Sequence, residues 1–418
     1  YTPGLYYSGK IKGQEHSLVV ISLFENEVMG MISPSGRSNL VIGNSPVLRR
    51  NSFVLFDDGQ VEAPAFNCMS NELPDWTKDL NLNQGGLRGK QSAAGCVGVY
   101  FECGLSVHDA KGGPSGAADF VSSFYNAVST IYSREGISTN ITEIKVWTTN
   151  EPYGLSSDRG LEDFSKAYPG GINGNLGHFI RLKSGTFNGL AWLDVLCKTN
   201  RYAYSEVSTN YTTFPTYSWT VNVIAHEMGH NLGSPHTQSC SWPGGAIDNC
   251  GNPEGTCAPG PRPVDGGTIM SYCHQLTSIG INFNNGFGTH PGNRIRDRVN
   301  NADCLSGCSG GGGTVTSSPD LIISSLTANP LELSSTSSTS TIEFNTTNAG
   351  NAASQASRSR AYFSADAALS ANDLTIADVD IASLNAGAGA SNSLNFKFPS
   401  GTSAGTYMLK DIYPGAYE

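Results

Sequence analysis

The sequence contains little charge and no excess of positive charge. Asp, Glu, Lys and Arg make up 14% of its 418 residues, compared with about 25% in an average globular protein. The formal net charge is −10, and the basic residues do not gather into a cluster. Nucleic acid and anionic membrane surfaces are therefore not expected partners.

Long hydrophobic runs and several chemical motifs are also missing. No apolar stretch is long enough to cross a bilayer. No nucleophile-elbow pattern supports a serine hydrolase, and Cys68 lacks a local cysteine-protease signature. No compact EF-hand-type run of ligands is present, which leaves calcium unsupported as a cofactor.

Cysteine, in contrast, is abundant. The ten cysteines, many of them in expected loops, favour an oxidising compartment and hence a secreted, extracellular protein. Four lie in one stretch rich in Pro and Gly: Cys240, Cys250, Cys257 and Cys273. Two disulfides would rigidify this stretch, whereas a zinc finger is the alternative, although paired CxxC spacing is lacking.

The most informative motif is the run AHEMGHNLGSPH at 225–236. On a helix, His226 and His230 lie one turn apart on the same face and can share one metal ion, with Glu227 beside the metal's water. Gly233 can take a left-handed conformation that ends the helix, so that His236 supplies a third nitrogen. Three protein ligands leave one coordination position open, as in catalytic zinc sites.

The alternative is a helix that carries three histidines on the protein surface. The neighbouring residues argue against it, because the helix is largely apolar at Val221, Val223, Ile224, Ala225 and Leu232. Buried histidines need partners, and a metal ion supplies them. The run therefore predicts one catalytic Zn²⁺.

A methionine follows downstream in GGTIMSYCH, at Met270. The HExxHxxGxxH run followed by such a methionine resembles the metzincin clan of metalloendopeptidases, in which this residue lies on a tight turn beneath the zinc histidines. The resemblance implies hydrolysis of peptide bonds in protein or peptide substrates. Zinc would lower the pKa of its water toward ~7 and polarise the scissile carbonyl, and Glu227 would act as general base.

Within the clan, residues 96–308 most resemble the adamalysin (reprolysin) branch, especially its bacterial secreted members. Apolar residues at helical spacing end before Gly136, and strands are expected at 97–103, 144–149, 177–182 and 189–197. Strands that alternate with helices predict an α/β (α+β) fold for this domain. By resemblance, Cys197 should be tied to Cys304 or Cys308.

The resemblance also implies a strand that borders the active-site cleft. Its residues Leu190, Ala191, Trp192 and Leu193 are the candidates for binding the substrate backbone by strand addition. Adamalysins usually have Asp directly after the third histidine, whereas this chain has Thr237.

Tyr272, two residues after Met270, instead resembles the astacin and serralysin branches. There a tyrosine helps to stabilise the tetrahedral intermediate. The alternative is a hydroxyl that forms a hydrogen bond in the cleft wall.

Residues 1–80 are expected to form a separate β-rich domain. Short strands are predicted at Leu18–Phe24, Val28–Ile32, Leu40–Ile42 and Phe53–Phe56. The region resembles an adamalysin-type propeptide, which would inhibit its own enzyme, and a generic β-domain is the alternative. Residues 81–95 are predicted to be a flexible linker in which cleavage near Arg88 and Lys90 could separate the two parts.

Cys68 is the only cysteine before that linker. A thiolate is a good zinc ligand and could occupy the position of the water in a latent form. Its place ahead of the catalytic domain suits the cysteine switch of metzincin zymogens, although no Gly-Val follows it. A disulfide from Cys68 is the alternative.

The C-terminal region is predicted to be a β-sandwich. A Gly/Ser linker at 309–318 precedes short alternating strands in 319–418, which favour an immunoglobulin-like fold. This region resembles the bacterial CARDB family, although its last strand is weak and the domain could be incomplete. For the whole chain we expect a monomeric zymogen; an adhesion protein with a metalloprotease-like domain is the alternative, against which the intact Glu227 argues.

Overall fold

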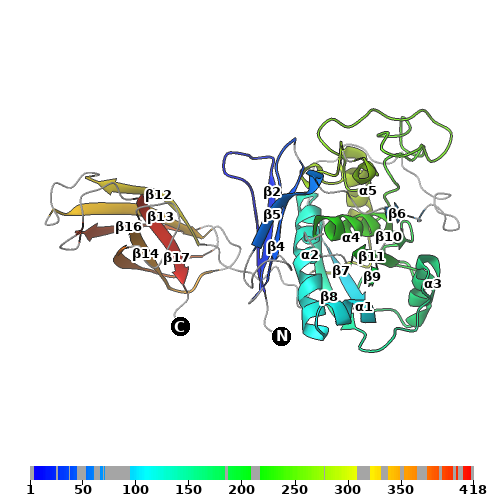
Figure 1. Ribbon diagram of the computed structural model, residues 1–418, viewed down its shortest axis with the longest axis horizontal. Coiled ribbons are helices and arrows are strands. Elements are labelled where there is room, and N and C mark those ends of the chain that lie inside the picture. Colours follow the sequence, from blue (N-terminus) through cyan, green and yellow to red (C-terminus); the bar gives the residue numbers. More distant parts are fainter. Residues whose placement is uncertain are drawn as a thin grey trace. The chain divides into compact units, whose positions relative to one another are not determined.

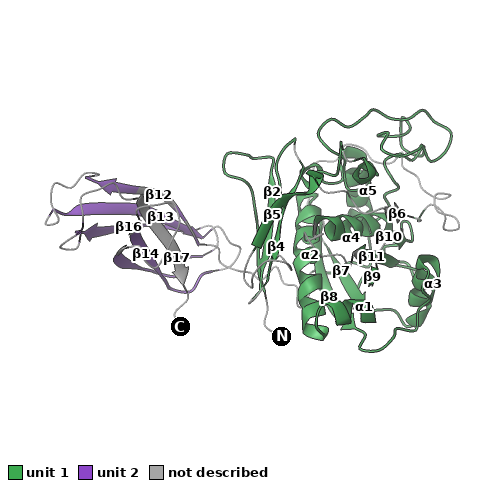
Figure 2. Ribbon diagram, viewed as in Figure 1, with its two compact units in different colours: residues 1–313 green, residues 314–418 purple. Residues whose placement is uncertain are grey.

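The computed structural model forms two compact units, residues 1–313 and 314–418 (Figures 1 and 2). The structure describes residues 4–24, 27–36, 38–44, 53–60, 66–68, 70, 95–183, 187–208, 217–276, 278–307, 321–330, 338–348, 353–364, 374–385, 388–398, 402 and 408–415. The predicted linkers at 81–95, apart from Gly95, and at 309–318 lie outside these ranges. No helix within the described ranges has the length and hydropathy of a membrane span.

The N-terminal region is an antiparallel five-stranded sheet in the order β1-β2-β3-β4-β5. Its strands are β1 (Leu5–Gly9), β2 (Leu18–Leu23), β3 (Val28–Ser33), β4 (Leu40–Asn44) and β5 (Phe53–Asp57), followed by the short helix η1 (Asp58–Gln60). Every second residue along β2 is buried, namely Leu18, Val20 and Ser22, as expected for a strand with one face against a core. The predicted β-rich N-terminal region is confirmed.

The central sheet has six strands in the order β6-β10-β11-β9-β7-β8. They are β6 (Phe66–Cys68), β7 (Cys96–Cys103), β8 (Ser138–Val146), β9 (Leu176–Lys183), β10 (Phe187–Ala191) and β11 (Tyr202–Ser208). Only the pair β10–β11 is antiparallel among these neighbours. The helices are α1 (Leu105–Ala110), α2 (Pro114–Arg134), α3 (Ser157–Ala167), α4 (Tyr217–Asn231), α5 (Thr289–Asn300), η4 (Cys273–Gln275) and η5 (Phe283–Asn285).

Strand β7 shows why this region is α/β. All eight of its residues are buried, because helices cover both faces of the sheet, as is usual for parallel strands. Val99 and Phe101 point into the core that contains α2 and α4, whereas Tyr100 points into the core that contains α3. The predicted mixed α/β fold is thereby confirmed.

The N-terminal sheet lies beside α2 (Figure 1), and the two share one hydrophobic core. Leu18, Val20 and Met31 are buried together with side chains of α2 such as Phe124. The contact also includes polar groups, since the Nδ2 atom of Asn126 on α2 donates to a backbone carbonyl of β2 at 3.2 Å. The sheet is therefore an integral layer of the first compact unit.

The strand predicted at 189–197 is wrong in its extent, because β10 ends at Ala191. The chain turns at Asp194, whose φ of 56° is left-handed. Its carboxylate forms ion pairs with Arg294 and Arg298 of α5 at 3.2 and 2.8 Å. A turn stabilised by a helix 100 residues away leaves no local pattern in the sequence.

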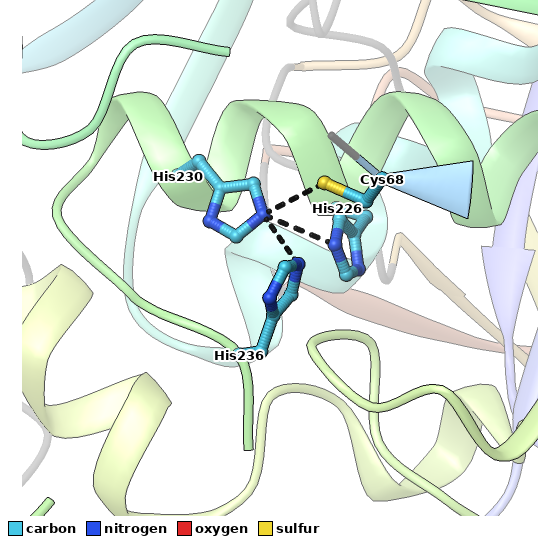
Figure 3. A group of neighbouring side chains, drawn as sticks. All are labelled: Cys68, His226, His230 and His236. Atoms are coloured by element: carbon cyan, nitrogen blue, oxygen red, sulfur yellow. Dashed lines mark hydrogen bonds between the residues drawn. The ribbon is translucent and has the colours of Figure 1, made fainter. Parts of the chain in front are cut away.

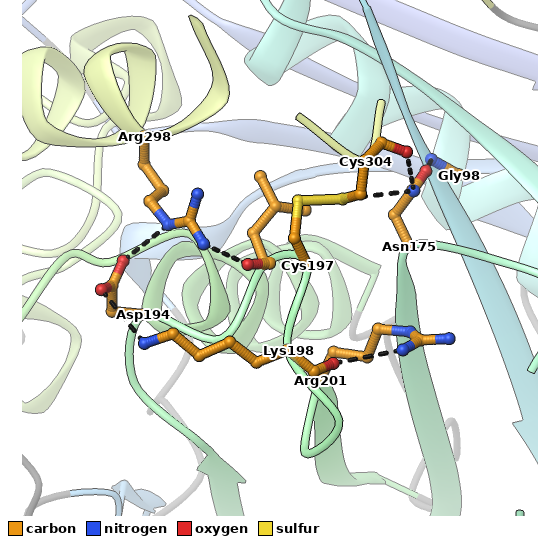
Figure 4. The surroundings of a disulfide bond; sticks show 9 residues. Gly98, Asn175, Asp194, Cys197, Lys198, Arg201, Arg298 and Cys304 are labelled. Atoms are coloured by element: carbon orange, nitrogen blue, oxygen red, sulfur yellow. Dashed lines mark hydrogen bonds and ion pairs between the residues drawn. A yellow bond between two sulfur atoms is a disulfide. The ribbon is translucent and has the colours of Figure 1, made fainter. Parts of the chain in front are cut away.

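Cys197 lies just after this turn and is bonded to Cys304, one of its two expected partners (Figure 4). The disulfide connects the end of the turn with the segment that follows α5. It closes a loop with a sequence separation of 107 residues, and closing a loop of that length restricts the unfolded chain strongly.

His178 on β9 is expected to make the first unit sensitive to acid. It is 1% exposed, its Nε2 lies 2.8 Å from the Ser205 hydroxyl, and burial lowers its pKa from 6.5 to about 3. Below pH 6.5 the unfolded chain binds a proton that the folded chain does not, so stability falls by about 1.4 kcal/mol per pH unit from this group as the pH drops from 6.5 toward 3.

We therefore expect His178→Gln to have a shallower loss of stability between pH 6.5 and 5 than the wild type. Urea unfolding followed by tryptophan fluorescence measures it, because all five tryptophans lie in residues 1–313. Exposed His290 offers the matched control, His290→Gln, which should follow the wild-type slope. Parallel slopes for His178→Gln and the wild type would show that His178 does not carry the effect.

The second unit is a β-sandwich, which confirms the predicted C-terminal fold. Its sheets are β12-β13-β16 and β15-β14-β17. The strands are β12 (Leu321–Asn329), β13 (Ser340–Asn348), β14 (Ser357–Ser364), β15 (Leu374–Ile381), β16 (Gly389–Phe396) and β17 (Met408–Gly415). Ile342, Phe344 and Ile381 lie in its hydrophobic core.

Candidate metal centre

Helix α4 and the turn after it carry the HExxHxxGxxH residues. His226, Glu227 and His230 lie on α4, which ends at Asn231. Gly233 has a φ of 93°, and a Cβ atom there would approach the Asp194 carboxylate to 2.9 Å. Glycine is therefore required at the turn that brings His236 back toward the helix, as the sequence predicted.

Four side chains from three segments meet at one point (Figure 3). The Nε2 atom of His230 lies 3.1 Å from Nε2 of His226 and 3.1 Å from Nε2 of His236. The Sγ atom of Cys68 is 3.4 Å from the same nitrogen. All four residues are buried, and their ligand atoms lie within 4.8 Å of one another.

The outer nitrogens of two rings fix their tautomers. Nδ1 of His226 lies 2.7 Å from the carbonyl oxygen of Ile269, and Nδ1 of His230 lies 2.7 Å from that of Ser234. A carbonyl oxygen only accepts, so each Nδ1 carries the proton. Burial lowers the pKa of both histidines well below 6.5, which keeps the rings neutral. Their Nε2 atoms therefore present lone pairs to the shared point.

The third ring has a different partner. Nδ1 of His236 lies 2.6 Å from the Oε1 atom of Glu254, and a carboxylate oxygen accepts this proton in the same way. The Nε2 atom of His236 therefore adds a third lone pair. Three converging lone pairs repel one another unless a cation lies between them.

The spacing of the donors fits zinc. A tetrahedral Zn²⁺ with Zn–N of 2.0–2.1 Å and Zn–S of 2.3 Å separates its ligand atoms by about 3.4 Å for N···N and about 3.5 Å for N···S. The distances around His230 are 3.1 Å and 3.4 Å. Imidazole and thiol donors without carboxylates also suit zinc better than calcium or magnesium. The alternative that Cys68 forms a disulfide is wrong, because Cys68 is a free, buried cysteine.

Glu227 lies beside this group in a buried environment. Burial raises its pKa to about 8, so the carboxyl holds a proton readily. Its Oε2 accepts a hydrogen bond from the Ser70 hydroxyl at 3.4 Å, and its Oε1 has no hydrogen-bond partner among the described residues. One oxygen of Glu227 is thus available to a small polar molecule.

Strand β6 lies at the edge of the central sheet and places Cys68 beside the histidines. It pairs with β10 in parallel, with Gly189 opposite Cys68. The Ser70 hydroxyl continues the contact by accepting from the backbone N–H of Ala191 at 2.9 Å. Of the four predicted cleft-strand residues, Leu190 and Ala191 belong to β10, and Trp192 and Leu193 follow its end.

Met270 lies against the histidine-bearing helix, and Tyr272 lies close to two of the histidine rings. Met270 is fully buried, and a Cβ atom on Gly229 of α4 would approach its sulfur to 2.5 Å. The backbone N–H of Thr237 donates to the carbonyl of Met270 at 3.1 Å. The Tyr272 ring is 4.8 Å from that of His236, and its hydroxyl donates to the Cys68 carbonyl at 2.8 Å.

The cysteine-rich stretch forms two disulfides, Cys240–Cys257 and Cys250–Cys273. The zinc-finger alternative for these four residues is therefore wrong. Glu254 in this stretch and Ser70 after β6 also lie at the centre but were not among the predicted site residues. Neither belongs to a motif, and only the fold brings them to the centre.

Comparisons with known proteins identify two regions of the chain. Residues 96–284 match the family model described as metallo-peptidase family M12, and residues 318–411 match the CARDB model. No curated protein matches the chain.

Solved structures are similar only at a distance. Metalloproteinase-II from Bacteroides fragilis is 13% identical, with 68% of this chain and 79% of that chain covered and a TM-score of 0.36. Wild-type OgpA from Akkermansia muciniphila is 12% identical, with coverages of 81% and 96% and a TM-score of 0.29. A chaperone–substrate complex is 13% identical, with coverages of 50% and only 35% of that chain and a TM-score of 0.32.

The identification therefore rests on the family models. M12 membership implies zinc, and the three histidines with Cys68 are the candidate site. The chain carries a reprolysin-like metallopeptidase domain of family M12 and a C-terminal CARDB domain.

Proposed function

We propose that the chain is a secreted zinc metalloendopeptidase in a latent form, with residues 1–80 as its propeptide. The observation that carries this proposal is the convergence of three Nε2 lone pairs and one thiol beside a buried carboxyl group. His226, His230 and His236 would hold one zinc ion. Cys68 would be the fourth ligand before activation.

The residues around the centre divide the catalytic work. When bound, zinc supplies a Lewis acid that polarises the scissile carbonyl and lowers the pKa of a coordinated water toward ~7. Glu227 would take a proton from the attacking water at Oε1 and deliver it to the leaving amine as the peptide bond breaks. Met270, which packs against Gly229 of the histidine-bearing helix, would help to keep the rings in place.

Tyr272 would gain a role once the propeptide leaves. Its hydroxyl donates to the Cys68 carbonyl, so it can donate to another carbonyl oxygen at that position. We propose that it then stabilises the charge that develops on the substrate oxygen. Its distance from the His236 ring supports this secondary role.

The substrate would bind along β10 as an extended strand. Strand β6 already pairs with this edge through backbone hydrogen bonds, which supports recognition of a polypeptide by strand addition. Leu190 and Ala191 would provide these backbone contacts, and Trp192 and Leu193 would flank them. A substrate must displace β6, so the same segment blocks both the metal and the cleft.

Activation would follow cleavage near Arg88 and Lys90. The disulfides of the first unit support an extracellular location. We further propose that the active species is a monomer that acts on protein or peptide substrates.

The metal and the chemistry can be tested together. We expect the purified chain to contain one zinc ion. After limited trypsin cleavage and trypsin inhibition, it should cleave a denatured protein substrate, and a chelator should abolish this activity until zinc is restored. Chelator-insensitive cleavage would contradict the mechanism. Retention of the substrate without cleavage would favour the alternative of a binding protein.

A further inference from the structure

The three histidines differ in the group that accepts a hydrogen bond from Nδ1. His226 and His230 each donate from Nδ1 to a neutral backbone carbonyl. His236 alone donates to a carboxylate, that of Glu254, at the shorter distance of 2.6 Å. Hydrogen bonds to ionised acceptors are shorter and roughly twice as strong as neutral ones.

The position of Glu254 is fixed by the backbone around it. Its N–H donates to the carbonyl of Gln238 at 3.0 Å, and its carbonyl accepts from the N–H of Cys240 at 3.0 Å. These contacts form a parallel bridge between Ser239 and Glu254. The disulfide Cys240–Cys257 closes the same loop. Backbone hydrogen bonds and a disulfide thus hold the segment that carries Glu254 against the residues that follow His236.

The carboxylate itself is held by a second donor. Nε2 of Gln238 donates to the same Oε1 atom at 3.2 Å. The His236 side chain is 0% exposed and that of Glu254 is 17% exposed. Few water molecules can screen a partly buried carboxylate, so the electrostatic interaction between Glu254 and the His236 ring is strong. A surface ion pair would not have this effect.

We infer that Glu254 is a positioning residue for the metal centre, which acts through His236. The inference rests on the proposed zinc site. Glu254 holds the His236 ring in the tautomer and orientation that direct Nε2 at the metal, and its negative charge increases the electron donation of that nitrogen. Carboxylate partners of zinc-bound histidines typically change metal affinity by 10–100-fold.

Zinc affinity and the cobalt spectrum of the full chain test this role. The metal-free proteins are titrated with zinc against a chromophoric chelator, and their cobalt-substituted forms are compared by visible absorption. We expect Glu254→Ala to raise the zinc Kd by about 10–100-fold and Glu254→Gln, which keeps an acceptor but loses the charge, by about tenfold. Both should shift the cobalt bands, because these report the donor strength of the ligands.

The matched control is Glu162→Gln, which removes an exposed carboxylate on α3 and should leave both readouts unchanged. Tryptophan fluorescence identifies the variants that fold. A folded Glu254 variant with a Kd within about twofold of the wild type and an unchanged cobalt spectrum would overturn the inference. Failure of the wild type to bind zinc would instead contradict the proposed function.

Discussion

Glu227→Gln should lower the peptidase activity of the trypsin-processed protein by about 10²–10⁴-fold, the usual contribution of a general acid–base residue. Glutamine has nearly the same size as glutamate but cannot accept the proton at Oε1. The helix should remain intact, because the substitution keeps the size of the buried side chain. Oε1 has no hydrogen-bond partner among the described residues, so no partner loses a bond there. The effect should fall on kcat, because proton transfer occurs in the chemical step.

Initial rates on a short quenched peptide measure this change, with both proteins processed by trypsin so that self-cleavage does not matter. The zinc content of each protein is the control. It should be unchanged, because the three histidines and Cys68 are retained. A Glu227→Gln protein with full zinc and wild-type kcat would mean that another group takes the proton.

Cys68→Ala should make the unprocessed chain active toward the same peptide. Cys68 Sγ lies 3.4 Å from Nε2 of His230, and its removal opens the fourth ligand position. Burial raises the pKa of this thiol well above 9, so only a neighbouring cation would make the thiolate the stable form. Loss of the proposed metal–thiolate bond should favour the state in which substrate can reach the metal. We therefore expect the activity of the unprocessed chain to rise by about 10–100-fold.

The chain offers a matched control in Cys103. Cys68 and Cys103 are both free and buried, but Cys103 lies on β7 and belongs to the hydrophobic core instead of the histidine cluster. Cys103→Ala should therefore remain latent. If Cys68→Ala also remains latent while trypsin activates it, the pairing of β6 with β10 is sufficient to block the enzyme without the thiol.

Local patterns predicted the parts of the site that depend on local geometry. The spacing of His226 and His230 required only a helix, and Gly233 required only a turn that an L-residue adopts poorly. Short apolar runs broken by glycine and asparagine gave the start of β2, β3, β4 and β5 correctly. In each case, the residues that determine the structure are neighbours in the sequence.

The remaining features depend on contacts between distant segments. Strand β10 stops early because Asp194 turns to meet α5, and the apolar residues after Ala191 hide that turn. Ser70 reaches Glu227 across 157 positions, and Glu254 reaches His236 from a loop without motif or periodicity. A sequence pattern cannot contain these pairs before the fold brings them together.

The shared core of the N-terminal sheet and α2 should keep the N-terminal region bound after the proposed activating cleavage. A cut near Arg88 would alter connectivity but would leave Leu18, Val20 and Met31 buried against the helix. The immediate product is then a two-chain complex held by noncovalent forces. If residues 1–80 are the propeptide, as proposed, their release would be a dissociation equilibrium governed by mass action, so dilution of the processed protein would promote activity.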